Sequence, residues 1–206
     1  MTNQTTGHIF SRMSKREDKK DQLLELGLEV MQERGYNGTS VKDIVDAAAV
    51  PKGSFYTYFD SKEAFAVEAI DRVANANYQE ARLVLGDTRK APLARLNEFF
   101  QSSAETACVG EFRVGCFLGN MCQEMADSSE LIRIKVKHTL GRITDLIGEV
   151  LEEAGQKSEM SNEHDKAVTA QFLFNAWEGA LMRMKAENSR EPLDAFLSML
   201  PKILGM

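Results

Sequence analysis

Cationic, hydroxyl-bearing and glycine residues are concentrated in one short stretch of the sequence, TSVKDIVDAAAVPKGSFYTYFDSK, at residues 39–62. Lysine ammonium groups can neutralise phosphates, and serine and tyrosine hydroxyls can bond phosphate oxygens or base edges. A glycine among them allows the backbone to approach a duplex closely. The residues of these types are Lys52, Gly53, Ser54, Tyr56, Tyr58 and Lys62. Together they favour contact with a groove of double-stranded DNA.

Two short helices joined by a tight turn are predicted in the same stretch. Ser40 and Asp43 form an S-x-x-D capping box, and the apolar residues that follow repeat at helical spacing until about Ala48. Pro51 suits the start of a second helix over residues 52–58. Two short helices in this order are typical of a helix-turn-helix DNA reader.

The second of these helices is expected to have an inward and an outward face. Phe55 and Phe59 lie four residues apart and should face the core, which leaves the polar residues toward solvent. A further helix is predicted to start at a D-x-x-E cap formed by Asp60 and Glu63. The structural alternative is a small helical subdomain whose tyrosines only pack.

The segment VPKGSFYTYFDSKEAF, with GYNGTSVKDI before it, resembles the DNA-binding head of the TetR/AcrR transcriptional regulators. The resemblance covers roughly residues 18–70. One departure is Ala49, where family members commonly carry glycine, so we expect some backbone strain in this turn. The family's pattern is matched by Gly35, Ser40, Ile44, Val50, Gly53, Phe55, Tyr56, Tyr58, Phe59, Lys62 and Glu63.

The resemblance implies a role for each polar residue of this head. Ser40 and Lys42 would hold phosphate or a nearby base from the start of the supporting helix, and Lys62 would clamp the DNA backbone. The recognition helix would carry Lys52, Gly53, Ser54, Tyr56 and Tyr58. The resemblance also implies a homodimer that binds a palindromic operator, represses transcription and is released by a small-molecule effector.

Composition indicates an all-α protein. The 206 residues are 43% hydrophobic, which supports a true core, and only four of them are proline. No run alternates Val, Ile, Thr and aromatic residues as strands do. We expect about nine helices, divided between a helix-turn-helix DNA-binding domain over 16–62 and a regulatory effector-binding and dimerisation domain over 63–206.

The sequence lacks the patterns of a membrane or secreted protein. No stretch approaches 18 uncharged apolar residues, and the first 20 residues contain no apolar signal segment. We therefore expect neither a membrane span nor a secretory signal, and a cytoplasmic location.

Charge argues against nonspecific binding to nucleic acid. The formal net charge is −6, and residues 1–70 hold nine Lys and Arg against eleven Asp and Glu. The first 20 residues nevertheless carry a local net charge of +3, and their basic residues are Arg12, Lys15, Arg16, Lys19 and Lys20. This segment is expected either to enter the minor groove as an arm or to form a solvated tail.

Long helices separated by glycine, proline and polar residues are predicted for the rest of the chain. Their expected ranges are 18–34 with Gly35 as its C-terminal cap, 61–85, 92–108, 113–125, 129–155, 163–187 and 192–204. Ser129 is predicted to cap the longest helix and Gly155 to end it. The resemblance implies that the last two helices form a four-helix dimer interface, and the alternative is an intrachain hairpin.

Met and aromatic residues between 92 and 184 could build an adaptable apolar pocket, although such residues at helical spacing are also ordinary core. The family binds diverse small molecules in this region, which implies an effector pocket here. The expected lining residues are Phe99, Cys116, Phe117, Met121, Phe172 and Trp177.

The three cysteines show no CxxC spacing, and His8, His138 and His164 lie far apart, so neither a metal site nor a cofactor is indicated. Cys116 is expected near the start of a helix and three residues after Arg113, where dipole and guanidinium would lower its pKa. Its stretch resembles the electrophile-responsive branch of the family. The two readings are an electrophile sensor and a buried small hydrophobe.

The sequence gives less support to two other classes of function. The sequence contains no Gly-rich phosphate loop, no GxSxG elbow and no HExxH helix, and nothing in it places Cys116 beside His138 for catalysis. A dimeric small-molecule-binding interaction protein without operator binding is the second alternative. The intact set from Lys52 to Lys62 favours a DNA-binding transcriptional repressor over both.

Overall fold

The computed structural model describes residues 15–109, 112, 115–160 and 165–205. Within these ranges every regular element is an α-helix and no strand occurs, which confirms the all-α prediction. The helices are α1 (Lys15–Arg34), α2 (Val41–Ala47), α3 (Lys52–Tyr58), α4 (Lys62–Leu85), α5 (Pro92–Cys108), α6 (Phe117–Met125), α7 (Glu130–Gln156), α8 (Lys166–Glu187) and α9 (Glu191–Leu204).

The start of α4 differs from the prediction. Ser61 is the residue that caps it, and the Ser61 hydroxyl accepts a hydrogen bond from the amide of Ala64 at 3.0 Å. The D-x-x-E cap at Asp60 and Glu63 was wrong, because the backbone is still extended at Ser61 and turns helical only after it. Glu63 instead accepts a hydrogen bond from the Ser129 hydroxyl at 2.5 Å.

Several other boundaries moved, and α1 begins at Lys15 rather than at residue 18. α6 begins at Phe117, with Cys116 as its N-cap, and α8 begins after Asp165, whose carboxylate accepts from two amides of its first turn. α7 is capped by Ser129 as predicted, but it continues through Gly155 and ends at Gln156. A glycine inside a helix costs only about 1 kcal/mol, and the buried Ala154 beside it keeps this last turn packed.

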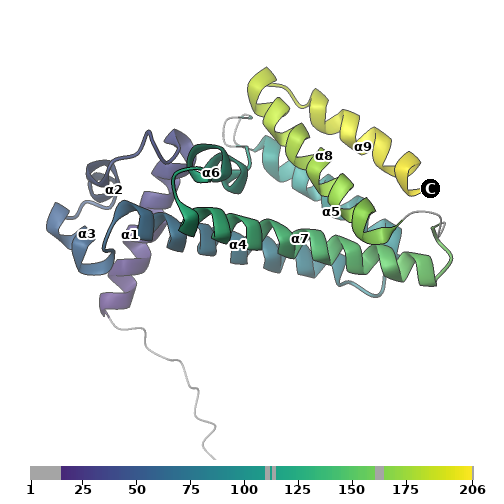
Figure 1. Cartoon of the computed structure of the whole chain (residues 1–206), viewed down its shortest axis with the longest axis horizontal. Helices are drawn as coiled ribbons and strands as arrows, with labels where there is room; N and C mark the ends of the chain where they lie inside the picture. The colour runs from purple at the N-terminus through teal and green to yellow at the C-terminus, as the bar shows by residue number, and fades with distance from the viewer. Residues whose placement is uncertain (1–14, 110–111, 113–114, 161–164, 206) are drawn as a thin grey trace, which may run out of the picture.

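α4 and α7 run side by side along the molecule and carry the other helices (Figure 1). α1, α2 and α3 form a head at one end, while α5, α8 and α9 pack around the opposite end. We call the latter group, with the adjoining halves of α4 and α7, the body. Although α4 and α7 are long, none of the helices described is both long and apolar enough to cross a membrane.

Two separate hydrophobic clusters hold the fold together. The head cluster joins α1, α2 and α3 to the first half of α4, to α6 and to the start of α7 through Ile132 and Val136. The body cluster joins the end of α4 to α5, α8, α9 and the rest of α7. Cys116 and Leu140 contact both clusters. α6 therefore lies where head and body meet.

Candidate DNA-binding surface and effector cavity

The predicted capping box and turn are both present between α1 and α3. The Ser40 hydroxyl accepts from the Asp43 amide at 3.2 Å, and the Asp43 carboxylate accepts from the Ser40 amide at 2.8 Å. Hydrogen bonds from Ser40 hold the pKa of Asp43 below its ordinary value. Ala49 has a φ of +52°, which confirms the expected strain at the position where the family commonly has glycine.

α3 has the inward and outward faces that the sequence predicted. Phe55 and Phe59 are buried, whereas Tyr56 is 54% exposed and packs only the edge of its ring against Phe55. Lys52 and Gly53 are exposed on the first turn, close to the position of Tyr56 one turn later. Ser54 and Tyr58 are half-buried at the margins of this surface. The exposed face of α3 is thus polar and open to a large ligand.

The lysines of the head differ in how much of their charge is engaged. Lys42 forms an ion pair with Asp46 one turn later on α2. No ion pair or hydrogen bond to the ammonium group of Lys52 is formed by the residues that the structure describes. Lys52 is therefore the lysine of this surface whose charge is most available to a phosphate.

Lys62 lies deeper than the prediction assumed. Its ammonium group donates to the carbonyls of Tyr36 and Thr39, both at 2.9 Å, and lies 4.0 Å from the centre of the Tyr36 ring. Partial burial lowers the pKa of Lys62. In this geometry Lys62 holds the loop between α1 and α2, and a phosphate contact remains a prediction that would use its third N–H.

The basic N-terminal segment is only partly described. Arg12 and the side chain of Lys15 lie outside the described residues, so the arm itself is not seen. Arg16 donates to the carbonyl of Thr57 at 3.4 Å, and Lys20 pairs with Glu68 at 2.6 Å. The described part of the segment is therefore attached to the head.

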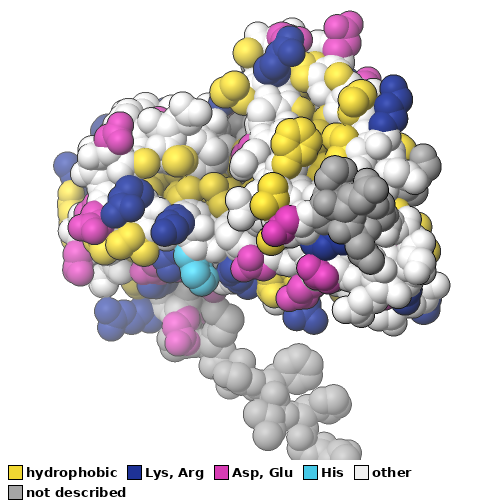
Figure 2. All heavy atoms as spheres, turned by 45° about the vertical axis from the view of Figure 1, so that its right-hand side comes forward, with side chains coloured by type: hydrophobic (Ala, Val, Ile, Leu, Met, Phe, Trp, Pro, Cys, Tyr) yellow, Lys and Arg dark blue, Asp and Glu magenta, His cyan; other side chains and the backbone are white. Residues whose placement is uncertain are grey.

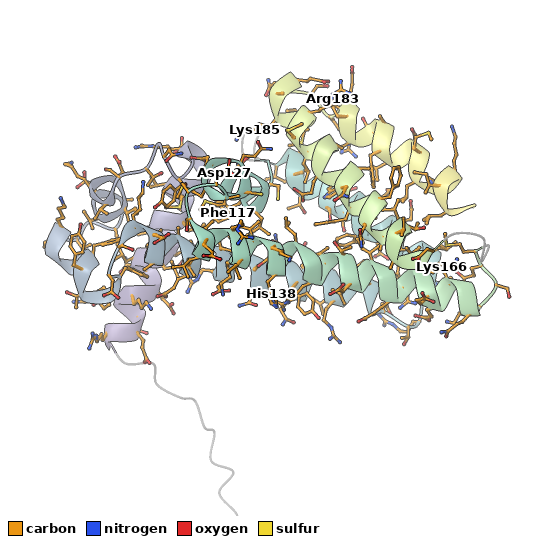
Figure 3. All side chains as sticks on the ribbon, in the orientation of Figure 1. Phe117, Asp127, His138, Lys166, Arg183 and Lys185 are labelled. Atoms are coloured by element: carbon orange, nitrogen blue, oxygen red, sulfur yellow. The ribbon has the colours of Figure 1, made fainter. Side chains whose placement is uncertain are left out.

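A cavity of about 530 Å³ lies between the two clusters, at the junction of α4, α5, α6, α7 and α8. Its wall is mainly apolar, with a few hydroxyl, amide and carboxylate groups from these helices. Four of the six predicted lining residues, namely Phe99, Cys116, Phe117 and Trp177, line it. Figure 3 shows Phe117 at the start of α6, between head and body.

The other two predicted residues do not line this cavity. Met121 is almost fully buried and packs within the head cluster instead. Phe172 is 56% exposed on the outer face of α8. Helical spacing indicated that these residues were apolar positions, but it could not indicate which neighbour each one would meet.

The pKa of Cys116 is shifted in the direction opposite to the prediction. Burial raises it first, and the negative charge of Glu178, to which the thiol is hydrogen-bonded, raises it further. The Sγ atom accepts from the Gly119 amide at 3.3 Å, as a helix cap would, but this effect is smaller. Arg113, the predicted activating charge, lies outside the described residues. A raised pKa disfavours the thiolate, which is the form that reacts with electrophiles.

Glu178 is the functional candidate that the sequence analysis missed. It lies on α8 within the cavity wall, next to Trp177 and one turn after Phe174, and burial raises its pKa. A signal was present, since Phe174, Trp177, Glu178 and Leu181 share one helical face that is otherwise apolar. A carboxylate on such a face is costly unless something pairs with it.

Among the described residues, neither the other two cysteines nor His138 forms a site with Cys116. His138 is exposed on the outer side of α7, away from Phe117 (Figure 3), and does not line the cavity. Cys108 and Cys122 are free thiols, and His8 and His164 lie outside the described residues. Across the part of the chain that is described, no three metal-binding side chains lie together.

Two family models match the chain. One, described as bacterial regulatory proteins of the tetR family, matches residues 23–69, and the other, a tetracyclin repressor-like C-terminal domain, matches residues 92–200. The first range contains α2, α3 and most of α1, and the second extends from the start of α5 into α9.

Known regulators of similar length also resemble this chain over most of its residues. The transcriptional repressor DhaR of Mycobacterium sp. (strain GP1) is 34% identical over 181 residues, which are 88% of this chain and 89% of DhaR. The transcriptional regulator AcuR of Cereibacter sphaeroides is 38% identical over 84% of this chain and 80% of AcuR. The crystal structure of Escherichia coli NemR in its reduced form has a TM-score of 0.83 at 28% identity, covering 91% of this chain and 97% of that chain.

Proposed function

The chain belongs to the TetR family of bacterial regulatory proteins and is a helix-turn-helix transcriptional regulator, and we propose that it is a homodimeric repressor released from a palindromic operator by an effector. The observation that carries this proposal is the exposed polar face of α3 at one end of a molecule that contains a small-molecule-sized cavity further along. We propose that residues 16–62 supply DNA binding and residues 63–206 supply effector binding and dimerisation, in the cytoplasm.

For the head, we propose that α3 enters the major groove and that the flanking residues contact the backbone. Lys52, Gly53, Ser54, Tyr56 and Tyr58 would make the contacts from α3. Ser40, Lys42 and Lys62 would support them from the starts of α2 and α4. The exposure of Lys52, Gly53 and Tyr56 on one face supports this assignment, because each can reach a duplex without rearrangement.

For the dimer, the outer surface of α8 and α9 supports the proposal. Val168, Phe172 and Met182 on α8 and Met199 on α9 are large apolar side chains that are each at least 47% exposed. Figure 2 shows hydrophobic side chains gathered over the upper half of the molecule, where Figure 1 places these helices. A second copy would cover this surface and would set the two heads on two half-sites.

For the effector, the volume and lining of the cavity support a small molecule. A space of about 530 Å³ lies within the range of sites for small ligands, and aromatic walls with a few polar groups are typical of them. Cys116 lies in this wall, but its raised pKa favours a ligand that binds without reacting with the thiol. We propose that the occupied body favours a dimer whose heads no longer match successive major-groove faces.

The interaction-protein alternative predicts a folded dimer without operator binding. Fluorescence anisotropy with the intergenic DNA that flanks the chain's own gene separates the two functions, especially when repeated at several salt concentrations. We expect saturable binding that Tyr56→Ala and Lys52→Ala weaken, with Lys90→Ala between α4 and α5 as the matched control for loss of an exposed lysine. A folded dimer that binds none of these fragments would favour the alternative.

A further inference from the structure

Glu124, near the end of α6, is bonded to the backbone of the head. One of its carboxylate oxygens accepts from the Tyr36 amide at 3.2 Å, and the other accepts from the Asn37 amide at 2.7 Å. Both amides belong to the loop between α1 and α2. A side chain that lies 87 residues later in the sequence thus fixes this loop with both of its oxygens.

The loop is shaped around this carboxylate. Gly35, the residue before Tyr36, has a φ of +76°, and a Cβ atom there would lie only 2.4 Å from the Glu124 Oε1 atom. Only glycine is compatible with both the backbone angle and the close approach. The position that the sequence analysis assigned to the cap of α1 therefore also makes room for Glu124.

Lys62 holds the same loop from the opposite side. While Glu124 accepts from the amide of Tyr36, Lys62 donates to the carbonyl of that residue and to that of Thr39. The loop leads directly into Ser40, the cap of α2. Any movement of the Glu124 carboxylate would therefore disturb the start of α2 and the placement of Lys62.

The other end of α6 lies at the cavity. Phe117 and Leu118 line it, and Cys116 caps the helix through Gly119. Glu124 lies seven residues after Phe117 in α6, so about 10 Å of helix separates this end from the loop contact. A ligand that displaces the start of this short helix would also displace its end.

We propose that Glu124 is the positioning residue through which the cavity controls the DNA-binding head. In the DNA-binding conformation, its carboxylate holds the loop at residues 35–37, and a ligand beside Cys116 and Phe117 withdraws it by moving α6. This role rests on the proposed function for its biological meaning. The contact itself can be tested without any DNA.

The first experiment measures hydrogen exchange of the Tyr36 and Asn37 amides by NMR in the full-length protein. Glu124→Gln removes the charge and one acceptor, so we expect exchange at these two amides to rise about tenfold or more. Glu130→Gln, which removes an exposed carboxylate from the first turn of α7, is the matched control and should leave them unchanged. Unchanged exchange in Glu124→Gln would overturn the contact.

The second experiment tests coupling to the cavity. A Cβ at Gly119 would lie 3.2 Å from the Glu178 carboxylate, so the larger side chain of Gly119→Leu must displace this carboxylate, the start of α6, or both. We expect faster exchange at the Tyr36 and Asn37 amides and operator binding weakened about tenfold. Gly119→Ala should have the same effects to a smaller extent, and it replaces Gly119→Leu if the leucine variant does not fold. Gly141→Leu, where a Cβ meets no atom within 4 Å, is the control.

The double variant decides whether the coupling runs through Glu124. If it does, Gly119→Leu should weaken operator binding less than about threefold in a Glu124→Gln background, since the link is already broken. A full tenfold loss there would show that the signal takes another route, such as along α4. If the protein binds no operator but the exchange effects are observed, the proposed function is refuted while the contact between Glu124 and the loop still holds.

Discussion

The head and the body are both built around three packed aromatic rings, but only the three of the body include a ring that borders the cavity. In the head, Phe55, Phe59 and Phe65 meet with ring centres 5.0 to 5.9 Å apart, and all three are almost fully buried. In the body, Phe100, Trp177 and Phe196 meet at 4.9 to 5.5 Å, yet Trp177 also faces the cavity. The same residue types thus build a rigid support for α3 in one region and an adaptable wall in the other.

Truncation of a ring should cost more in the head than at the cavity. Phe65→Ala empties a site that is packed on all sides, and we expect the free energy of unfolding to fall by about 3–5 kcal/mol. Phe174→Ala removes a ring that already borders empty space, so its loss should be smaller. Urea unfolding followed by circular dichroism measures both. Equal losses would show that the cavity wall is as tightly packed as the head.

Loss of Lys62 should affect the stability of the head as well as DNA binding. Lys62→Met keeps the length of the side chain but leaves the carbonyls of Tyr36 and Thr39 without their donor, which should cost about 2 kcal/mol. Thermal unfolding and operator titration measure the two effects separately. If Lys62 only contacts phosphate, operator affinity should fall while stability does not change.

Burial in the cavity wall should slow the alkylation of Cys116. Because the pKa of Cys116 is raised, less thiolate is present at pH 7 than for an ordinary cysteine, and alkylation should rise with pH well above that point. We expect N-ethylmaleimide to modify Cys116 at least about tenfold more slowly than the exposed Cys122, as followed by peptide mass mapping.

Glu178 should account for part of this slow reaction. Glu178→Gln removes the negative charge, so the pKa of Cys116 should fall and its alkylation should become faster, whereas Glu80→Gln at the exposed rim of the cavity should have less effect. A slower reaction in Glu178→Gln would indicate instead that the carboxylate takes the thiol proton during attack.

The smallest expected effect concerns the turn of the head. Ala49→Gly removes the cost of a left-handed alanine but adds freedom to the unfolded chain, so stability should rise by up to about 1 kcal/mol. Differential scanning calorimetry is the appropriate measurement. A decrease would mean that strain at Ala49 is smaller than the entropy that glycine adds.

The sequence predicted those features of the head that depend on neighbours along the chain. Ser40 and Asp43, Pro51, and the pair Phe55 and Phe59 act within one or two turns, so their spacing was enough to place α2 and α3. The predicted cap of α4 was wrong because Asp60 and Ser61 are both good caps, and the spacing does not tell that the backbone becomes helical only after Ser61.

The body depends more on contacts between distant residues. The pKa of Cys116 is raised by burial and by Glu178, which lies 62 residues later, and no local pattern contains that pair. Met121 and Phe172 were assigned to the cavity because they are apolar residues in helices, but helix packing placed one in the head and the other on the surface. The hydrogen bonds from the Asn37 and Tyr36 amides to Glu124 could not be predicted from the sequence for the same reason.

The position of Trp177 gives the protein a built-in optical probe. It is the only tryptophan in the chain, and its indole forms part of the cavity wall while touching Phe100 and Phe196. Any molecule that enters the cavity changes the polarity around this one fluorophore. Emission excited near the red edge of indole absorption therefore reports occupancy directly, without a label, and compounds can be screened before a single operator has been identified.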